Sequence, residues 1–338
     1  MSHRLLPLMM SLVVLLSLLI AAIMVSARGQ FSDDVFYVQR DGDGWRIYVL
    51  DASQRVSAAI GPILRTDTQP NRLEVLRAPG NRFVTYMQGG HIWLVDVPTG
   101  ERIDLGRGAN PAWSPDGRHL AYALDGRIHV TEITSDGSAT LVTAFPQADG
   151  PAYDSELAWS PDGERLLWLR YIPANTDVEV YVANADGTNM QNLSDDPQHG
   201  NWNPAWSPDG ERIAYVTYNR AGEEIIIAQL AERTRQSIVT GINYESGPVW
   251  AADGQMLAYM ERLGGMYFRI NAVDVSQQPW QHSLDLSIMA RGWGGLYWLP
   301  GRYEIVFVHA RSGDLYTVDL NGTAHRLTFD GEVKVVLP

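Results

Sequence analysis

The sequence predicts an all-β protein built from repeated four-stranded antiparallel units, and two observations carry this prediction. The first is a motif, Trp-Ser-Pro-Asp-Gly followed by a short apolar stretch, that returns along most of the chain. The second is that apolar residues after Val25 show no helical period of 3.6 residues. Hydrophobic residues make up 45% of the 338 residues and charged residues 19%, which is enough apolar material for a large core.

The motif is a true internal repeat. An aromatic residue follows nine positions after the Trp position in every copy, as Tyr215 follows Trp206. A degenerate early copy has Arg77 in the Trp position and reaches Tyr86. Successive tryptophans lie 44 to 48 residues apart, at Trp113, Trp159, Trp206, Trp250 and Trp298.

Each copy is expected to form four strands. A short strand ends at the Trp, Ser-Pro-Asp-Gly makes a tight turn, and an alternating second strand such as 212–217 follows. A third strand and a short polar fourth strand complete the period. Four short antiparallel strands in about 40–45 residues are the signature of one blade of a β-propeller.

The ends of the chain bear on the number of blades. Six copies begin near residues 73, 111, 157, 204, 248 and 296. Upstream, residues 35–57 resemble strands two to four of another blade, and downstream residues 332–337 form a strand with no blade of its own. We therefore expect this last strand to become the innermost strand of blade one and to close a seven-bladed ring without a free edge. Six blades with an irregular N-terminal hairpin is the alternative.

The repeat Trp-Ser-Pro-Asp-Gly-x-x-[Leu/Ile]-Ala-Tyr resembles that of the TolB-like propellers, a bacterial envelope family. The resemblance covers nearly all of the chain from Val35 onward. In that family the propeller is a platform for protein interactions, so the resemblance implies a binding role. The family's namesake carries a folded domain ahead of its propeller, whereas only a short stretch separates Ala27 from the first expected strand.

Residues 1–30 are expected to form an N-terminal hydrophobic segment, and residues 31–338 the propeller domain. The apolar run 5–25 is long enough, as a helix, to cross a hydrocarbon core of about 30 Å. Positive charge at Arg4 predicts that the chain after Val25 lies on the outer side of the membrane. The family resemblance implies that this side is the periplasm of a bacterial envelope. The length of the run favours an uncleaved single-pass signal-anchor, and Val25-Ser26-Ala27 leaves a signal peptide cleaved after Ala27 open.

Several kinds of site are not expected. The net charge of −13 and a single lysine, Lys334, argue against nucleic-acid binding. The chain has no cysteine, no Gly-x-Ser-x-Gly elbow and no His-x-x-x-His spacing. Asp41-Gly-Asp-Gly44 starts like a calcium loop but has Ser53 where the bidentate Glu should stand. We therefore expect no metal, no cofactor and no enzymatic activity.

The repeated acids are best explained as turn formers: Asp116, Asp162, Asp209 and Asp253.

The longest connections between blades carry the candidate binding residues. These connections share one face of the propeller, opposite the Ser-Pro-Asp-Gly turns. Aromatic residues and Arg dominate binding hot spots, and loops on a rigid scaffold commonly carry recognition. Asp149, Asp154, Asp195 and Asp196 make this rim acidic, which favours a basic peptide over an anionic glycan. The expected partner-binding residues are Tyr153, His199, Trp202, Tyr244, Arg291 and Trp293.

Three functions are compatible with this pattern. The one we favour from the sequence is a non-enzymatic, exported platform that binds a protein or peptide at the rim of the inter-blade loops. The first alternative is a propeller enzyme or ligand-binding protein that acts on glycan or peptide at the central channel. The second is a purely architectural module, in which Trp202 and Trp293 merely seal the top of that channel.

Overall fold

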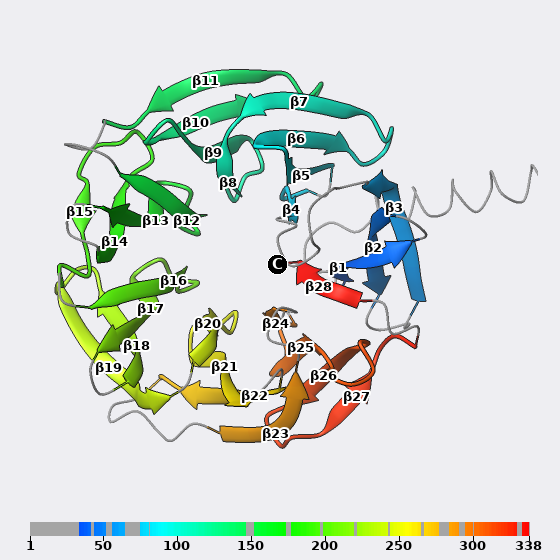
Figure 1. The fold of residues 1–338 in the computed structure, drawn as a ribbon, viewed down its shortest axis with the longest axis vertical. Helices are drawn as coiled ribbons and strands as arrows, with labels where there is room; N and C mark the ends of the chain where they lie inside the picture. Colours follow the sequence, from blue (N-terminus) through cyan, green and yellow to red (C-terminus); the bar gives the residue numbers. More distant parts are fainter. Residues whose placement is uncertain are drawn as a thin grey trace, which may run out of the picture.

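The structure, a computed structural model, consists of strands joined by turns and loops. The residue ranges given below contain no helix. Their strands form four-stranded antiparallel sheets arranged around a central axis (Figure 1). The prediction of an all-β fold with four-stranded antiparallel blades is therefore confirmed. The described residues are 34–41, 44–51, 56–64, 75–80, 82–146, 152–173, 177–196, 199–219, 222–242, 244–264, 267–276, 284–290, 295–299, 301–329 and 333–337.

Over these ranges the sheets number seven, and six of them use four consecutive strands each. The first sheet has the order β28-β1-β2-β3, formed by Val333–Leu337, Asp34–Asp41, Gly44–Asp51 and Val56–Leu64. The second is β4 (Val75–Arg77), β5 (Phe83–Gln88), β6 (His91–Asp96) and β7 (Arg102–Arg107). The third is β8 (Ala109–Trp113), β9 (His119–Leu124), β10 (Arg127–Ile133) and β11 (Ala139–Ala144).

The remaining four sheets follow the same order. The fourth is β12 (Tyr153–Trp159), β13 (Arg165–Ile172), β14 (Asp177–Asn184) and β15 (Gln191–Asn192). The fifth is β16 (Gly200–Trp206), β17 (Arg212–Asn219), β18 (Gly222–Gln229) and β19 (Thr234–Ile242). The sixth is β20 (Tyr244–Trp250), β21 (Met256–Gly264), β22 (Tyr267–Asp274) and β23 (Leu284–Ala290), and the seventh is β24 (Leu296–Trp298), β25 (Glu304–Val308), β26 (Leu315–Asp319) and β27 (Ala324–Arg326).

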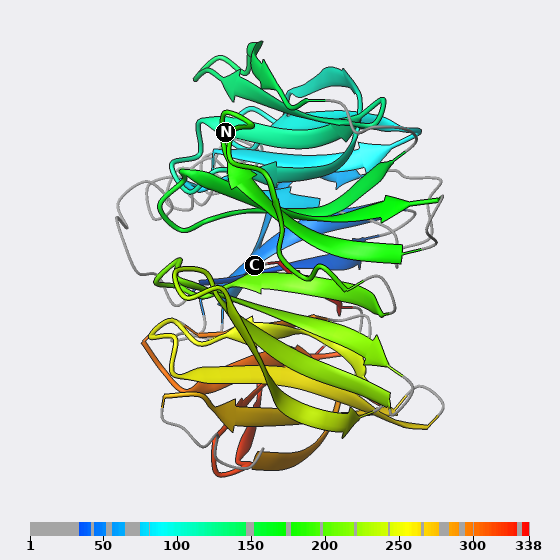
Figure 2. The same cartoon turned by 90° about the vertical axis from the view of Figure 1, so that its left-hand side faces the viewer.

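The first strand of each sheet lies nearest the central axis and the fourth lies at the periphery (Figure 1). Seen from the side, the sheets are twisted and follow one another around the ring (Figure 2). In every copy of the repeat the innermost strand ends at the Trp position, as β12 ends at Trp159 and β16 at Trp206. The repeat therefore places the start of each innermost strand on one face of the ring and its Ser-Pro-Asp-Gly turn on the other.

The aromatic residue nine positions after the Trp forms the centre of each blade. Five such residues are at most 2% exposed: Tyr86, Trp168, Tyr215, Tyr259 and Phe307. In several blades it lies directly opposite a second aromatic residue on the third strand. Ring centroids are 5.7 Å apart for Trp168 and Tyr181 and 6.5 Å for Tyr86 and Trp93. Such cross-strand pairs stabilise a sheet beyond the area that they bury.

The first sheet joins the two ends of the described chain. Tyr37 of β1 lies opposite Tyr48 of β2 with 5.4 Å between ring centroids, so β1 and β2 occupy the second-strand and third-strand positions of a blade. β28 pairs with β1 in antiparallel register, with Tyr37 opposite Val336 and Val38 opposite Val335. Tyr37 and Val38 are each 1% exposed. The innermost strand of this sheet is thus supplied by residues 333–337.

The predicted membrane anchor lies in a part of the chain that the structure does not describe. Residues 5–25, on which the membrane anchor depends, lie outside the described residues. Within the described part of the chain, no helix is both long enough and apolar enough to cross a membrane.

Candidate functional site

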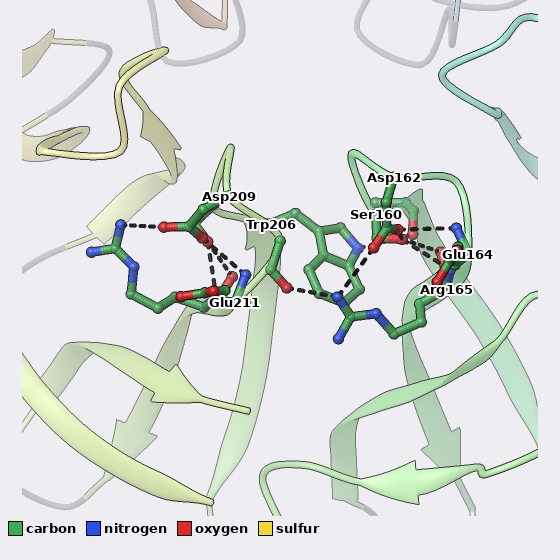
Figure 3. A network of polar contacts seen from close by, with 11 residues as sticks. Ser160, Asp162, Glu164, Arg165, Trp206, Asp209 and Glu211 are labelled. Atoms are coloured by element: carbon green, nitrogen blue, oxygen red, sulfur yellow. Dashed lines mark hydrogen bonds and ion pairs between the residues drawn. The ribbon is translucent and has the colours of Figure 1, made fainter. Parts of the chain in front are cut away.

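The repeated Asp residues form the turns on one face of the ring. In the fourth blade the Ser160 hydroxyl donates to the Asp162 carboxylate, and the backbone N–H of Glu164 donates to the same oxygen at 3.0 Å (Figure 3). Partial burial opposes ionisation of Asp162, but these two hydrogen bonds and nearby Arg165 outweigh it and lower its pKa. Asp209 repeats the arrangement with Ser207, the backbone N–H of residue 211 and Arg212. These carboxylates are engaged in turn structure.

The Trp of each repeat links its blade to the preceding one. The indole N–H of Trp206 donates to the carbonyl oxygen of Ala158 at 3.3 Å, and that of Trp159 donates to Ala112 at 3.0 Å. In four repeats the acceptor is the carbonyl of the residue just before the preceding Trp. The indole of Trp113 instead donates to the hydroxyl of Thr85 at 3.2 Å. The guanidinium of Arg165 donates to the carbonyl of Gly210 in the next blade and lies 4.9 Å from the ring centroid of Trp206 (Figure 3). This network explains why the motif recurs, and it makes the turn face structural.

Three innermost strands, β8, β12 and β16, have a bulge three residues before the Trp. Asn110, Glu156 and Asn203 all adopt positive φ there, at 51°, 51° and 50°. The register of each innermost strand with its neighbour shifts at this point. The bulges are also tied between blades, because the carboxylate of Glu156 accepts the backbone N–H of Asn203 at 2.9 Å. The side-chain amide of Asn110 donates to the carbonyl of Asp154 at 3.2 Å. The start of each inner strand is thereby fixed relative to the next blade.

Two exposed tyrosines lie at the start of β12 and the end of β13. Tyr153 is 64% exposed and Tyr171 36%, and their rings stack with 6.3 Å between centroids. The adjacent cross-strand pair is a buried ion pair: Arg170 donates to both carboxylate oxygens of Asp154, at 2.8 and 2.9 Å. Arg170 also lies 5.1 Å from the ring centroid of Tyr181. The ion pair joins β12 to β13 next to the two tyrosines and points to the opposite face of the sheet.

The next blade carries an exposed tryptophan on its innermost strand, two residues after the position that corresponds to Tyr153. Trp202 is 38% exposed and meets Tyr218, which is 54% exposed, edge to face with 6.5 Å between ring centroids. Gly200, the counterpart of Tyr153 in the pairing register, lies beneath the indole. A Cβ on Gly200 would be only 2.6 Å from Cη2 of Trp202, so the indole needs a glycine there. Tyr153, Tyr171, Trp202 and Tyr218 are hereafter the aromatic rim.

The connection that leads into β16 is anchored by a buried acid. Glu179, 5% exposed, accepts a hydrogen bond from the Ser194 hydroxyl and another from the side-chain amide of Asn201 at 3.5 Å. Asn201 also donates to the carbonyl of Val178 at 2.9 Å. His199 is half-buried, with its Nδ1 2.7 Å from the Asp196 carboxylate. Glu179 thereby ties Ser194 and Asn201, on either side of this connection, to β14.

The structure brings together some of the residues predicted from the sequence. Tyr153, His199 and Trp202 lie in or beside the same region of blades four and five. Tyr244 begins β20, but its side chain is not among those described. Arg291 and Trp293 lie outside the described residues.

Sequence reasoning missed the other two members of the aromatic rim. Tyr171 and Tyr218 both stand twelve positions after their Trp, at the end of the second strand. Comparing the two repeats position by position would have found this shared tyrosine. It would also have indicated that both side chains lie on the face opposite the turns.

The chemistry available at the aromatic rim is stacking and hydrogen bonding. Among the described residues, no three or more His, Asp or Glu side chains are grouped so as to hold a metal ion. Burial raises the pKa of Tyr215 to about 12, with Arg235 opposing the shift, so this phenol beneath the connection stays protonated. Exposed Asp195 and Glu156 and half-exposed Asp196 give the surroundings an acidic character.

Comparison with known proteins places this fold in a family. The model of the TolB beta propeller domain matches residues 168–336, which is half of the chain. The chain belongs to the TolB β-propeller domain family.

One relative in sequence and two solved structures are similar to this chain. The peptidase YuxL of Bacillus subtilis is 33% identical over 85 residues, which cover 23% of this chain and 12% of that protein. This chain therefore spans far less than two thirds of that relative. The TolB structure from Acinetobacter baumannii is 15% identical with a TM-score of 0.51, covering 90% of this chain and 82% of that one. An oligogalacturonate lyase from Vibrio parahaemolyticus is 12% identical with a TM-score of 0.62, covering 86% and 87%.

These relatives correct one prediction. From the absence of a nucleophile motif we expected a protein without enzymatic activity, and that expectation is wrong. The repeat is shared with a protein named as a peptidase, and the fold is shared with a lyase. The missing Gly-x-Ser-x-Gly elbow excludes one mechanism of hydrolysis and leaves other chemistry on this scaffold open.

Proposed function

We propose that this propeller binds a peptide or glycan at the mouth of its central channel, on the aromatic rim of blades four and five. The observation that carries the proposal is that two adjacent blades each present two exposed aromatic side chains, one on the innermost strand and one near the end of the second strand. Aromatic side chains offer a large contact area at low entropic cost, because they have few rotatable bonds. Rings that stay exposed on a rigid base are therefore suited to stacking against a ligand.

The charge of the region favours one class of ligand over another. The chain carries a net charge of −13, and the acids nearest the aromatic rim include Asp195, Asp196 and Glu156. Arg170, the basic residue next to Tyr171 in the strand, is buried in its ion pair with Asp154. A neutral or basic peptide, or an uncharged sugar, would be attracted or tolerated here. An acidic glycan would be repelled.

A second candidate function is turnover of that ligand at the channel. The observation that favours it is that a relative is named as a peptidase and a protein of the same fold as a lyase. Glu156 is an exposed carboxylate on an innermost strand, and it is the residue whose replacement tests this candidate. Loss of turnover on peptide and glycan panels in Glu156→Gln would support catalysis at the channel.

Two further parts of the proposal concern architecture and location. We propose that the sheets form one seven-bladed ring closed by β28, which is supported by its pairing with β1. We also propose that the propeller acts on the extracytoplasmic side of a bacterial envelope, anchored through residues 5–25 or released after Ala27. The apolar run and the family resemblance support this location.

Photo-crosslinking from position 202 in native envelopes tests the binding proposal. Tyr303 is a matched control, because it is 40% exposed and lies on the opposite face, next to Asp253 of the preceding blade. One dominant adduct from position 202 that is absent from position 303 would support the aromatic rim as the binding site and identify the ligand. Equal, diffuse capture from both positions would contradict it.

A further inference from the structure

The outer strand of the third blade is an exposed sheet edge. β11 pairs with β10 on one side and is the last strand of its sheet (Figure 1). Five of its six residues are exposed, and Leu141 and Val142 are 55% and 56% exposed. An edge strand presents backbone N–H and C=O groups that can pair with another strand.

The side chains of β11 lack the usual protection of an edge. Proteins commonly blunt such edges with charges, proline, very short strands or β-bulges. Of these, β11 has only a bulge of one residue. β15 and β27 have two and three residues, and β7 carries Arg102, Asp104 and Arg107. β11 has the sequence Ala-Thr-Leu-Val-Thr-Ala, with no charge and no proline. Among the outer strands whose side chains are described, β11 is thus the one best suited to pairing.

The sequence of β11 is nearly the same read in either direction. In an antiparallel pair of two copies, Ala139 would face Ala144, Thr140 would face Thr143, and Leu141 would face Val142. Each contact matches side chains of the same kind, and threonine pairs and aliphatic pairs across strands are favourable. A two-fold symmetric dimer requires such a self-complementary surface.

We propose that β11 is a self-association edge, at which two copies of this chain pair antiparallel about a two-fold axis between Leu141 and Val142. Charge favours a second copy as the occupant. Two chains of net charge −13 repel one another, and β11 is a stretch where they meet without placing like charges opposite each other. β7 pairing with itself in the same way would place Arg102 opposite Arg107.

The bulge in β11 concentrates the apolar contact. The register with β10 passes from Thr143 opposite Val130 to Leu141 opposite Thr131, so Val142 is the inserted residue. Two residues of a bulged strand oppose one residue of the neighbouring strand, which brings Leu141 and Val142 to one local site. Pairing of two copies would bury both residues from each chain and remove apolar surface from water.

Sedimentation velocity of the purified full chain, over a range of concentrations, tests the proposal. Wild type is expected to show a reversible monomer–dimer equilibrium. Val142→Lys should weaken it roughly tenfold or more, because like charges would then meet near the two-fold axis. Thr240→Lys adds the same charge at an exposed site on the outer strand β19 and should leave dimerisation unchanged. A monomeric wild type, or a dimer that Val142→Lys leaves intact, would overturn the proposal.

Disulfide trapping tests the register, and the chain has no cysteine of its own to interfere. Chains carrying Thr140→Cys mixed with chains carrying Thr143→Cys should form a covalent dimer, since directly opposite residues lie within disulfide range. Either variant alone should form much less. Equal trapping in the mixture and in both single variants would show contact without this register and would contradict the two-fold pairing.

Discussion

At the scale of single residues, the motif forms a tight turn and also links neighbouring blades. Only the turn-forming role can be predicted from the sequence. The turn role of Asp162 follows from its place in Ser-Pro-Asp-Gly, and the structure adds the bonds from Ser160 and from the backbone of Glu164. The indole of Trp206 and the guanidinium of Arg165 instead bond to neighbouring blades. Repeat spacing alone could not reveal those acceptors, because they are backbone carbonyls about one repeat away.

The turn carboxylates predict a loss of stability in acid. Their pKa values are lowered in the folded chain, so their contribution is present above the unfolded value of about 3.9 and is lost as the pH falls through the folded value. Urea titrations between pH 7 and pH 2.5 should show stability falling below about pH 4. Asp162→Asn should lower stability at pH 7 by about 1 kcal/mol and flatten this dependence. Glu164→Gln, in an exposed position of the same turn, is the control and should leave the profile unchanged.

Gly200 and Trp202 should be energetically coupled. Gly200→Ala places a methyl group 2.6 Å from the indole and should cost about 1–3 kcal/mol of unfolding free energy. In the background of Trp202→Ala the same change should cost much less, because the clashing ring is gone. A double-mutant cycle by urea denaturation measures this coupling. Equal cost in both backgrounds would contradict the placement of the indole over the glycine.

At the scale of elements, the sequence predicts strands better than it predicts side-chain groupings. The innermost strands end at their tryptophans, as the motif indicates, because Ser-Pro-Asp-Gly breaks the strand locally. The aromatic rim is only half predicted. Tyr153 and Trp202 lie near long connections between blades, which the sequence analysis singled out. Tyr171 and Tyr218 lie near the ends of regular strands, and their positions in the sequence do not differ from those of other strand residues. Their exposure depends on how adjacent blades pack, which no single repeat contains.

At the scale of the whole molecule, one sheet is completed by a pairing between the two strands most distant in the chain. β1 and β28 lie almost 300 residues apart in the chain, and together they complete one sheet. The sequence could suggest this pairing because the early strands lack a first member and the last strand has no blade. Its contribution to stability depends on closing a very long loop, which costs entropy that local contacts must offset.

Removal of residues 333–337 measures that contribution. Without β28, the inner edge of β1 would lose its backbone partner, and the buried Tyr37 and Val38 would face water. The unfolding free energy should fall by more than about 3 kcal/mol, with a clear drop in melting temperature. Deleting Pro338 alone leaves the strand intact and serves as the control. Val335→Pro is a second variant, because proline removes one ladder donor without shortening the chain. If the truncated chain melts at the wild-type temperature, the ring does not depend on β28, and six blades with an N-terminal hairpin becomes the better description.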